Sequence, residues 1–139
     1  MNYILDTCVV SELIRVHPEK KVISWIDSVD ERKLYLSVVT IGELEKGIEK
    51  LVPSLKKDKI LDWLHGDLLV RFSNRILSLD DGIMLKWGQL TGSLEKKGLP
   101  MSTLDSLIAA TALHYHYCLV TRNESDFINC DLPIFNPWK

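Results

Sequence analysis

Strand-like and helix-like segments alternate along this chain, and this alternation limits the fold more than any other feature. Strands are predicted at five places, Asn2–Leu5, Leu34–Val38, Ile76–Leu79, Tyr117–Thr121 and, as a short fifth one, Ile134–Phe135. Apolar residues between them recur at the spacing of one helix face. Such alternation favours a parallel sheet. The predicted fold class is therefore α/β, with a central, mainly parallel sheet of four or five strands flanked by helices.

Local signals indicate where the helices begin and end. The pair His17-Pro18 ends the first helix, and another helix is expected to start near Thr40. Asp80 or Asp81 is expected to cap the helix after the third strand. The helix from about Thr103 to Tyr115 contains three alanines, which favours close packing on the sheet.

Length and composition predict one globular domain. The chain has 139 residues, 46% of them hydrophobic and 26% charged, which fits a single domain spanning residues 1–139 with one core. The net charge of -2 argues against a protein that coats nucleic acid by bulk electrostatics. It leaves room for an enzyme that holds nucleic acid locally.

The cysteines and the N-terminal segment bear on location. Cys8, Cys118 and Cys130 are odd in number and far apart, so neither a disulfide framework nor a zinc site is indicated, and free thiols fit a reducing compartment. No signal-peptide core precedes Asp6, and no apolar run is long enough to span a bilayer. We therefore expect a cytoplasmic protein without membrane association.

Four acidic residues stand where a strand stops or a helix begins. Asp6 follows the first strand, Glu43 the second and Asp126 the fourth, while Asp105 opens the alanine-containing helix. The carboxyl ends of parallel strands meet at one edge of an α/β sheet, where such folds bind their ligands. Gathered carboxylates repel one another unless a cation lies between them, and hard divalent cations prefer oxygen ligands.

Each of these carboxylates has an alternative role at a helix start. The alternatives are a cap by Asp6 at Thr7, the capping box Thr40-x-x-Glu43, a looser version in Ser102-x-x-Asp105, and a cap by Asp126 at Phe127. For any one residue alone, capping is the commoner role. Capping does not require all four to lie at the same sheet edge, whereas metal binding does. Carboxylates without nearby His or Cys ligands indicate Mg²⁺- or Mn²⁺-dependent phosphodiester cleavage.

Four segments that contain these residues resemble the motifs of one family. They are Tyr3–Leu13, Ser37–Ile48, Asp105–Ala112 and Leu119–Phe127. Together, in this order and spacing, they resemble the PIN-domain ribonucleases, in particular the VapC-type toxins of type II toxin–antitoxin pairs. The resemblance covers nearly the whole chain. It implies a PIN-like α/β/α sandwich.

The resemblance also implies roles for individual residues. Asp6, Glu43 and Asp105 match the core metal-binding carboxylates, and Asp126 matches the family's variable fourth acidic position. The polar residues around them would be Thr7, Thr121 and Asn123. Cys8 departs from the family, which more often has a small polar residue there.

The activity and partners that the resemblance implies follow from these roles. Mg²⁺, or Mn²⁺, would activate a water molecule that attacks an RNA phosphorus in line and leaves a 5′-phosphate. The protein would be a homodimer, and a cognate antitoxin would block the site. An amphipathic antitoxin segment is expected to dock on apolar surface left by Val22–Ile26 and Leu55–Leu69, with a basic residue reaching the carboxylates.

Other interpretations of the same residues remain open. A haloacid-dehalogenase-like phosphotransferase would use Asp6 as a nucleophile, but it needs a second Asp where Cys8 stands. A non-catalytic PIN-like module that binds protein or RNA is the main alternative, and DNA cleavage would use the same metal chemistry. Arg122 is expected near the site, either on a phosphate or in a structural ion pair. The four tryptophans are expected mainly in packing roles, although tryptophan also stacks on RNA bases.

Overall fold

A computed structural model describes residues 1–139. Its centre is one sheet of five strands, in the spatial order β3-β2-β1-β4-β5. The strands are β1 (Tyr3–Leu5), β2 (Leu34–Ser37), β3 (Ile76–Leu77), β4 (Cys118–Val120) and β5 (Ile134–Phe135). Every neighbouring pair is parallel. The predicted α/β class with a sheet of four or five strands is confirmed, and the sheet has five strands and is wholly rather than mainly parallel.

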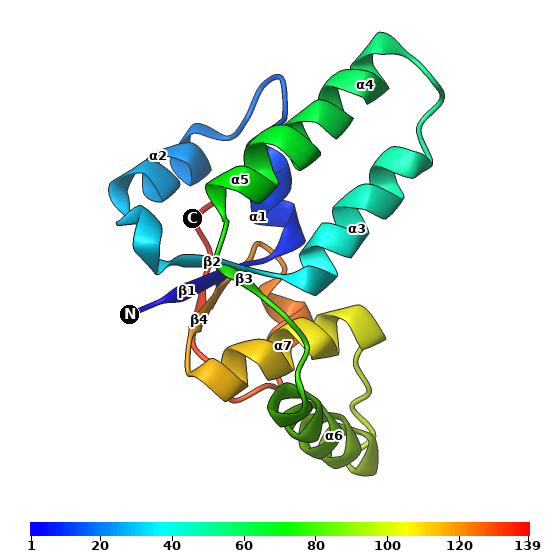
Figure 1. The fold of residues 1–139 in the computed structure, drawn as a ribbon. Coiled ribbons are helices and arrows are strands. Elements are labelled where there is room, and N and C mark those ends of the chain that lie inside the picture. Colours follow the sequence, from blue (N-terminus) through cyan, green and yellow to red (C-terminus); the bar gives the residue numbers. More distant parts are fainter.

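Helices cover both faces of this sheet. The α-helices are α1 (Thr7–Glu12), α2 (Lys20–Ser28), α3 (Val38–Glu49), α4 (Leu55–Asp62), α5 (Leu69–Arg71), α6 (Asp81–Lys96) and α7 (Thr103–Tyr115). A π-helical turn, η2 (Trp63–Leu68), joins α4 to α5, and two 3₁₀ turns are η1 (Glu31–Lys33) and η3 (Glu124–Phe127). Figure 1 shows α1 to α5 on one side of the sheet and α6 and α7 on the other.

Alternation along the strands divides the core into two apolar clusters, one on each face. In β1, Leu5 belongs to the cluster under α1, α2, α3 and η2, whereas Ile4 belongs to the cluster under α7. In β4, Val120 and Leu119 divide in the same way. Successive side chains of a strand point to opposite faces, so strands buried on both sides are apolar throughout.

Several boundaries differ from those expected from the sequence: α1 ends at Glu12 and not at His17, and β3 ends at Leu77 and not at Leu79. The second strand ends at Ser37, whose hydroxyl accepts a hydrogen bond from the Val39 N–H over 3.1 Å, so α3 begins at Val38 and not near Thr40. The capping box Thr40-x-x-Glu43 is therefore wrong, because both residues lie inside the helix. β-branched Val38 and Val39 favour a strand locally, but the cap at Ser37 and tertiary packing outweigh that preference.

The small-residue helix packs as predicted. Ala109, Ala110 and Ala112 of α7 are fully buried, and Ala109 and Ala112 belong to the cluster that includes Ile4 and Leu119. Short side chains let the helix axis approach the sheet closely. This approach fixes the start of α7, and with it Asp105, next to the sheet edge.

One buried carboxylate shapes the turn between α1 and α2. Glu12 is 2% exposed, and it accepts hydrogen bonds from the Arg15 guanidinium over 2.9 Å and from the Glu19 backbone N–H over 3.0 Å. Burial by itself would raise the pKa of Glu12, but these hydrogen bonds and the Arg15 charge outweigh it and lower the pKa. Glu12 is thus a paired structural charge, outside the set expected at the metal site. None of the helices is both long and apolar enough to cross a lipid bilayer.

Candidate functional site

Asp6 stands at the carboxyl end of β1, the middle strand of the sheet, and is 5% exposed. Its Oδ1 accepts the Thr7 backbone N–H over 2.8 Å, so the expected helix cap is formed. Its Oδ2 accepts the Thr121 hydroxyl over 2.8 Å. A carboxylate has about four lone-pair positions, so each oxygen can still accept a further ligand. Capping and metal binding are therefore compatible at Asp6.

Glu43 comes to the site from the neighbouring helix α3. The Thr7 hydroxyl donates to Glu43 Oε1 over 2.8 Å, and the oxygens of Thr7 and Thr40 are 3.1 Å apart. Thr40 is fully buried. A hydroxyl network thus joins the start of α1 to α3 and fixes the Glu43 side chain, which is not used for capping. Thr40 is thus a neighbour of the site, a position that its sequence pattern indicated only as a helix cap.

Asp105 lies half-buried in the first turn of α7. The cap of this helix is Ser102, whose Oγ accepts the Asp105 N–H over 3.3 Å. Asp126 is exposed on η3, whose capping residue is Asn123 and not Asp126. The Asn123 side chain makes no hydrogen bond. Its backbone N–H instead donates to the Thr121 hydroxyl over 3.0 Å.

Burial and the negative charges of neighbouring carboxylates both raise the pKa values of Asp6 and Asp105. Burial raises the pKa of Asp6 most strongly, hydrogen bonds from Thr121 and Thr7 lower it, and the negative charges of Asp105 and Glu43 raise it further. Burial likewise raises the pKa of Asp105, the Ser102 hydroxyl lowers it, and the charge of Asp126 raises it. Asp6 is thus the centre of the group, and Asp126 joins it through Asp105. A bound cation would relieve this repulsion.

The donor set fits a hard cation, although no three acidic, histidine or cysteine side chains gather into a closed ligand cluster. Magnesium commonly keeps several waters and uses one or two protein carboxylates together with substrate phosphate, so an open acidic edge suits it. The sulfur nearest Asp6 belongs to Cys8, whose Sγ is 3.9 Å from Asp6 Oδ2. Burial raises the pKa of the Cys8 thiol, which keeps it protonated and a poor metal ligand.

Arg122 lies near the site, beside the Cys8 thiol, as expected. Its guanidinium lies over the Trp138 ring, 4.8 Å from the ring centroid, and it forms no ion pair. The alternative of a structural ion pair at Arg122 is therefore wrong. A cation over an indole face is attracted by the ring's quadrupole, which explains the stacked arrangement.

An apolar groove opens directly beside Glu43. It has a volume of about 230 Å³ and lies between α1, α3 and the α4–η2 segment, with Ile14, Leu51 and Ile60 among its lining residues. The stretch Val22–Ile26 does not contribute, because Val22 and Ile26 are buried against the sheet. The expectation of free apolar surface is therefore wrong for Val22 and Ile26, which form part of the core, whereas Ile23 and Trp25 of that stretch are only half-buried.

Comparison with known proteins agrees with this geometry. The family model described as PIN domain matches residues 3–131. The toxin FitB of Neisseria gonorrhoeae is 33% identical over 97% of this chain and 97% of its own length. The VapC ribonuclease Y4jK of Sinorhizobium fredii is 32% identical over 98% of this chain and 97% of its own length.

A solved structure matches the whole fold. The crystal structure of FitAcB from Neisseria gonorrhoeae superimposes with a TM-score of 0.92 at 33% identity, covering 98% of each chain. Sequence and fold therefore point to the same group of proteins along nearly the full length. This chain belongs to the PIN domain family.

Proposed function

We propose that this chain is a metal-dependent endoribonuclease that acts as the toxin of a type II toxin–antitoxin pair. The observation that carries the proposal is Asp6, a buried carboxylate at the end of the central strand that is repelled by Glu43 and Asp105. Burying an ionised carboxylate beside other negative charges is unfavourable unless a cation or a substrate binds to it. Residues 1–139 would act as one PIN domain.

The relatives support the same activity. A VapC ribonuclease and the toxin FitB are similar to this chain from end to end. A ribonuclease is a phosphodiester hydrolase, which suits an acidic, oxygen-only site. Three core carboxylates are all present, which speaks against the alternative of a non-catalytic PIN-like binding module.

Each site residue has a defined task in this proposal. Asp6, Glu43 and Asp105 would hold Mg²⁺, with Mn²⁺ as a substitute, and Asp126 would hold it directly or through water. When bound, such an ion supplies a nucleophile at neutral pH and stabilises charge on the phosphate.

The neighbouring polar groups keep the carboxylates in place. The Thr121 hydroxyl orients Asp6, and the Thr7 hydroxyl orients Glu43. Asn123 supports Thr121 through its backbone N–H. Outer hydrogen bonds of this kind typically change metal affinity or activity by roughly 10- to 100-fold.

Cleavage of RNA tests the proposal directly. Purified protein free of antitoxin would be incubated with a labelled small-RNA pool in Mg²⁺, in Mn²⁺ and in EDTA, beside the Asp105→Asn variant. We expect discrete cuts that need the metal and that Asp105→Asn reduces by roughly 100-fold or more, because a ligand charge is lost while size is kept. If the Asp105→Asn variant cuts RNA as fast as the original chain, Asp105 is not a metal ligand.

A control substrate and a binding measurement separate the alternatives. A single-stranded DNA pool of matched length tests whether the 2′-hydroxyl matters. RNA that is bound but uncut in every metal, by protein shown to be folded, would favour the non-catalytic module.

The antitoxin is proposed to dock in the groove beside Glu43. The groove is apolar along Leu51 and Ile60 and ends at a carboxylate. An amphipathic segment would fill the apolar part, and an Arg or Lys on it would reach the acidic edge and relieve the repulsion there. The positive charge of that Arg or Lys would then take the place of the metal ion and block the site.

A pair of adjacent residues provides a matched test of this docking. Leu51 lines the groove and is 40% exposed, whereas Val52 lies outside it and is 78% exposed. We expect Leu51→Asp to weaken binding of the cognate antitoxin about tenfold or more in calorimetry, because a charge would enter an apolar contact. Val52→Asp should leave the affinity unchanged. Equal effects of both substitutions would place the antitoxin elsewhere.

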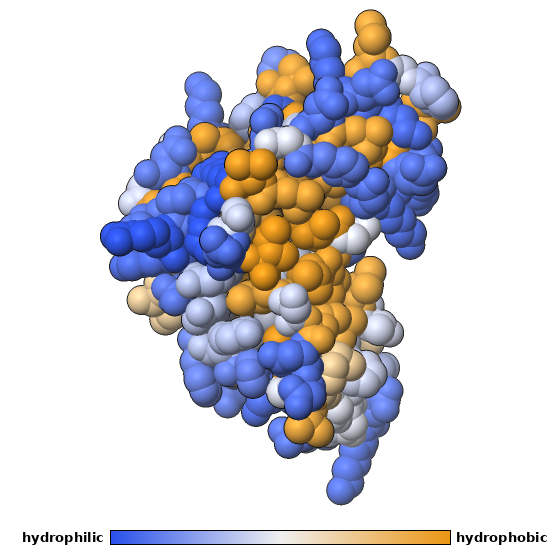
Figure 2. Space-filling view, viewed as in Figure 1, coloured by the Kyte–Doolittle hydropathy of each residue, from blue (hydrophilic) through white to orange (hydrophobic).

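A homodimer is proposed through the β3 edge of the sheet. β3 has a partner only on its β2 side, and Figure 2 shows an apolar strip across the face where β3 lies in Figure 1. Unpaired edges and contiguous apolar surface favour association, and twofold dimers are the commonest form. Light scattering should give the mass of two chains at micromolar concentration. The mass of one chain throughout would contradict the homodimer.

A further inference from the structure

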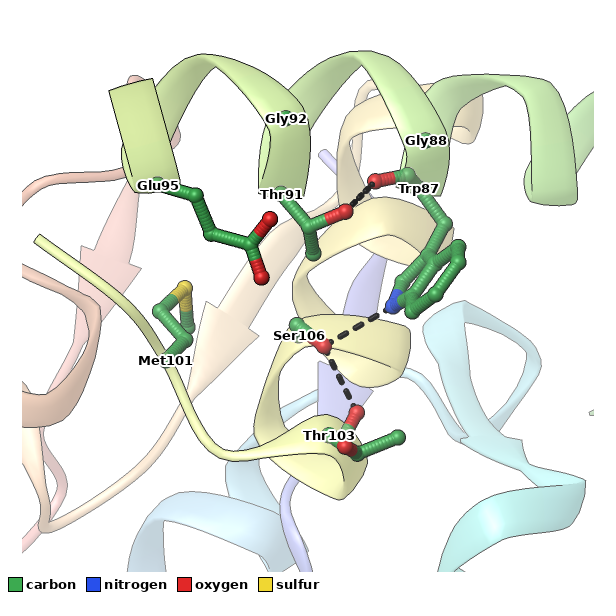
Figure 3. Close-up of a pocket in the computed structure, with 8 residues that line it drawn as sticks. All are labelled: Trp87, Gly88, Thr91, Gly92, Glu95, Met101, Thr103 and Ser106. Atoms are coloured by element: carbon green, nitrogen blue, oxygen red, sulfur yellow. Dashed lines mark hydrogen bonds between the residues drawn. The ribbon is translucent and has the colours of Figure 1, made fainter. Parts of the chain in front are cut away.

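A second cavity lies between α6 and α7, on the side of the sheet opposite the groove. Its volume is about 340 Å³, and Figure 3 shows it bounded above by α6 and below by the start of α7. We call it the α6/α7 cavity. Neither the carboxylate site nor the proposed antitoxin groove includes any of its lining residues.

The cavity adjoins the acidic edge. Thr103 and Ser106 line it, and both lie within one helical turn of Asp105 on α7. On the other side Met101 lines it, and the Met101 sulfur is 3.3 Å from Cys130 Sγ. Burial raises the pKa of Cys130, and the charge of Asp105 raises it further, so Cys130 is near that carboxylate. A nucleotide in the cavity would therefore be next to a phosphodiester held at the site.

The polar groups in its wall are paired with two exceptions. The Trp87 indole N–H donates to Ser106 Oγ over 2.8 Å, and the Ser106 hydroxyl donates to the Thr103 carbonyl over 2.7 Å. The Thr91 hydroxyl donates to the Trp87 carbonyl over 2.8 Å. These bonds hold the indole ring in one orientation against the cavity. Its wall is thus preorganised before any ligand enters.

The exceptions are the Thr103 hydroxyl and Glu95, which is an exposed residue at the rim of the cavity. Its carboxylate takes part in no hydrogen bond or ion pair of this chain, and Figure 3 shows it directed from α6 into the space beside Thr91 and Met101. Lys96 and Lys97 follow it in the sequence and are exposed, so the local charge does not repel an RNA backbone. A carboxylate can only accept hydrogen bonds, so a ligand that replaces the water at Glu95 must offer hydrogen-bond donors such as N–H groups.

Two glycines keep the α6 side of the cavity flat. Gly88 and Gly92 lie one turn apart on α6 and line the cavity, and a Cβ built at either would meet no atom within 4 Å. Packing within the chain therefore does not require them, although glycine in a helix interior costs roughly 1 kcal/mol relative to alanine. Gly47, which borders the groove beside Glu43, has the same open surroundings. A bare helix surface lets a planar ring approach closely.

We propose that the α6/α7 cavity is a subsite that binds a guanine base of the RNA, with Glu95 accepting hydrogen bonds from it. Among the four bases, only guanine presents two adjacent N–H donors, N1–H and the 2-amino group, to a carboxylate. Adenine and cytosine place a ring acceptor next to their amine, and uracil flanks its N–H with two carbonyls, so each would repel one carboxylate oxygen. Aromatic walls such as Trp87 commonly contact unstacked RNA bases.

The inference rests on the proposed ribonuclease function, so binding and cleavage are measured separately. In EDTA, a labelled single-stranded pentamer with one guanine would be compared by fluorescence anisotropy with the same pentamer carrying inosine, which lacks the 2-amino group. We expect guanine to bind about tenfold more tightly, because hydrogen bonds to a charged acceptor are the stronger kind. Glu95→Gln should remove the difference. Equal binding of both pentamers by the original chain would overturn the subsite.

Cleavage of a random-sequence RNA pool in Mg²⁺ gives the second measurement. Guanine should be enriched at one fixed position near the cut, and Glu95→Gln should abolish that enrichment while cutting continues. Gly92→Leu should also abolish it by filling the cavity, whereas Ser93→Leu, the adjacent exposed residue of α6, should preserve it.

The outcomes separate the two proposals. If the chain prefers guanine in binding but cleaves no RNA in any metal, the ribonuclease function is contradicted and the subsite is supported. Metal-dependent cleavage without any base preference would contradict the subsite and support the ribonuclease function. A Gly92→Leu variant with unchanged RNA binding but weakened self-association or antitoxin binding would assign the cavity to a protein partner and overturn the proposal.

Discussion

The Asp6→Asn variant is expected to lose RNA cleavage by roughly 100-fold or more while remaining as stable as the original chain, or more stable, in EDTA. Changing a group that only orients a metal ligand typically costs roughly 10- to 100-fold, so losing the ligand itself should cost at least the upper figure. The carboxamide keeps the size of the carboxylate, and its oxygen can still accept the Thr7 N–H that Asp6 accepts now.

The stability side of this prediction follows from the direction of the pKa shift. The folded state raises the pKa of Asp6, chiefly through burial and then through the charges of Asp105 and Glu43. A raised carboxyl pKa means that folding is opposed by the ionised form, and this penalty develops above the unfolded pKa and is fully present above the folded pKa. Asn carries no charge, so the penalty disappears.

Thermal melting and initial cleavage rates together test this expectation. Mg²⁺ should raise the melting temperature of the original chain and have a much smaller effect on Asp6→Asn, because binding to the folded state alone stabilises it. Asp62→Asn, an exposed residue of α4, is the matched control and should change neither quantity. A large loss of stability in EDTA on Asp6→Asn would instead mean that Asp6 serves mainly as a structural cap.

The second large effect is expected at Phe72, where Phe72→Ala should lower the free energy of unfolding by roughly 3–5 kcal/mol. Phe72 is fully buried at the end of α5 and belongs to the larger apolar cluster. The guanidinium of Arg75 lies 4.8 Å from its ring centroid. Arg75 in turn donates to the Leu34 carbonyl over 2.7 Å, at the start of β2. Truncation of Phe72 would leave a cavity and remove the ring against which Arg75 packs.

Denaturant unfolding provides the measurement, because domains of this size are typically stable by only about 5–15 kcal/mol. The control is Val70→Ala, two residues earlier and 67% exposed, which should change stability by no more than about 0.5 kcal/mol. A loss below about 1 kcal/mol at Phe72 would mean that the surrounding side chains collapse into the space.

The order of elements and the position of each acidic motif were predictable from the sequence. Strand and helix periodicities are local properties, and they placed Asp6 at the end of the first strand and Asp105 at the start of a helix, as the structure has them. Element boundaries also depend on capping and tertiary packing. Val38 reads as strand by its β-branched side chain, yet it begins α3 because Ser37 caps the helix there.

The contacts that build the site depend on tertiary structure. Thr121 donates to Asp6 from 115 residues away in the chain, and Thr7 donates to Glu43 from 36 residues away. No local pattern encodes such pairs, because they arise only when the strand order β3-β2-β1-β4-β5 brings β4 beside β1 and α3 beside α1.

By itself, then, the sequence determined which residues are acidic, which segments are strands or helices, and that the carboxylates would share one sheet edge. The tertiary structure alone decided which hydroxyl holds which carboxylate. It also decided that Val22 and Ile26 are buried, and that α6 and α7 leave a cavity containing the unpaired carboxylate of Glu95. The physical reason is that periodicity sets which way a side chain faces, whereas its neighbours depend on how separate elements pack against one another.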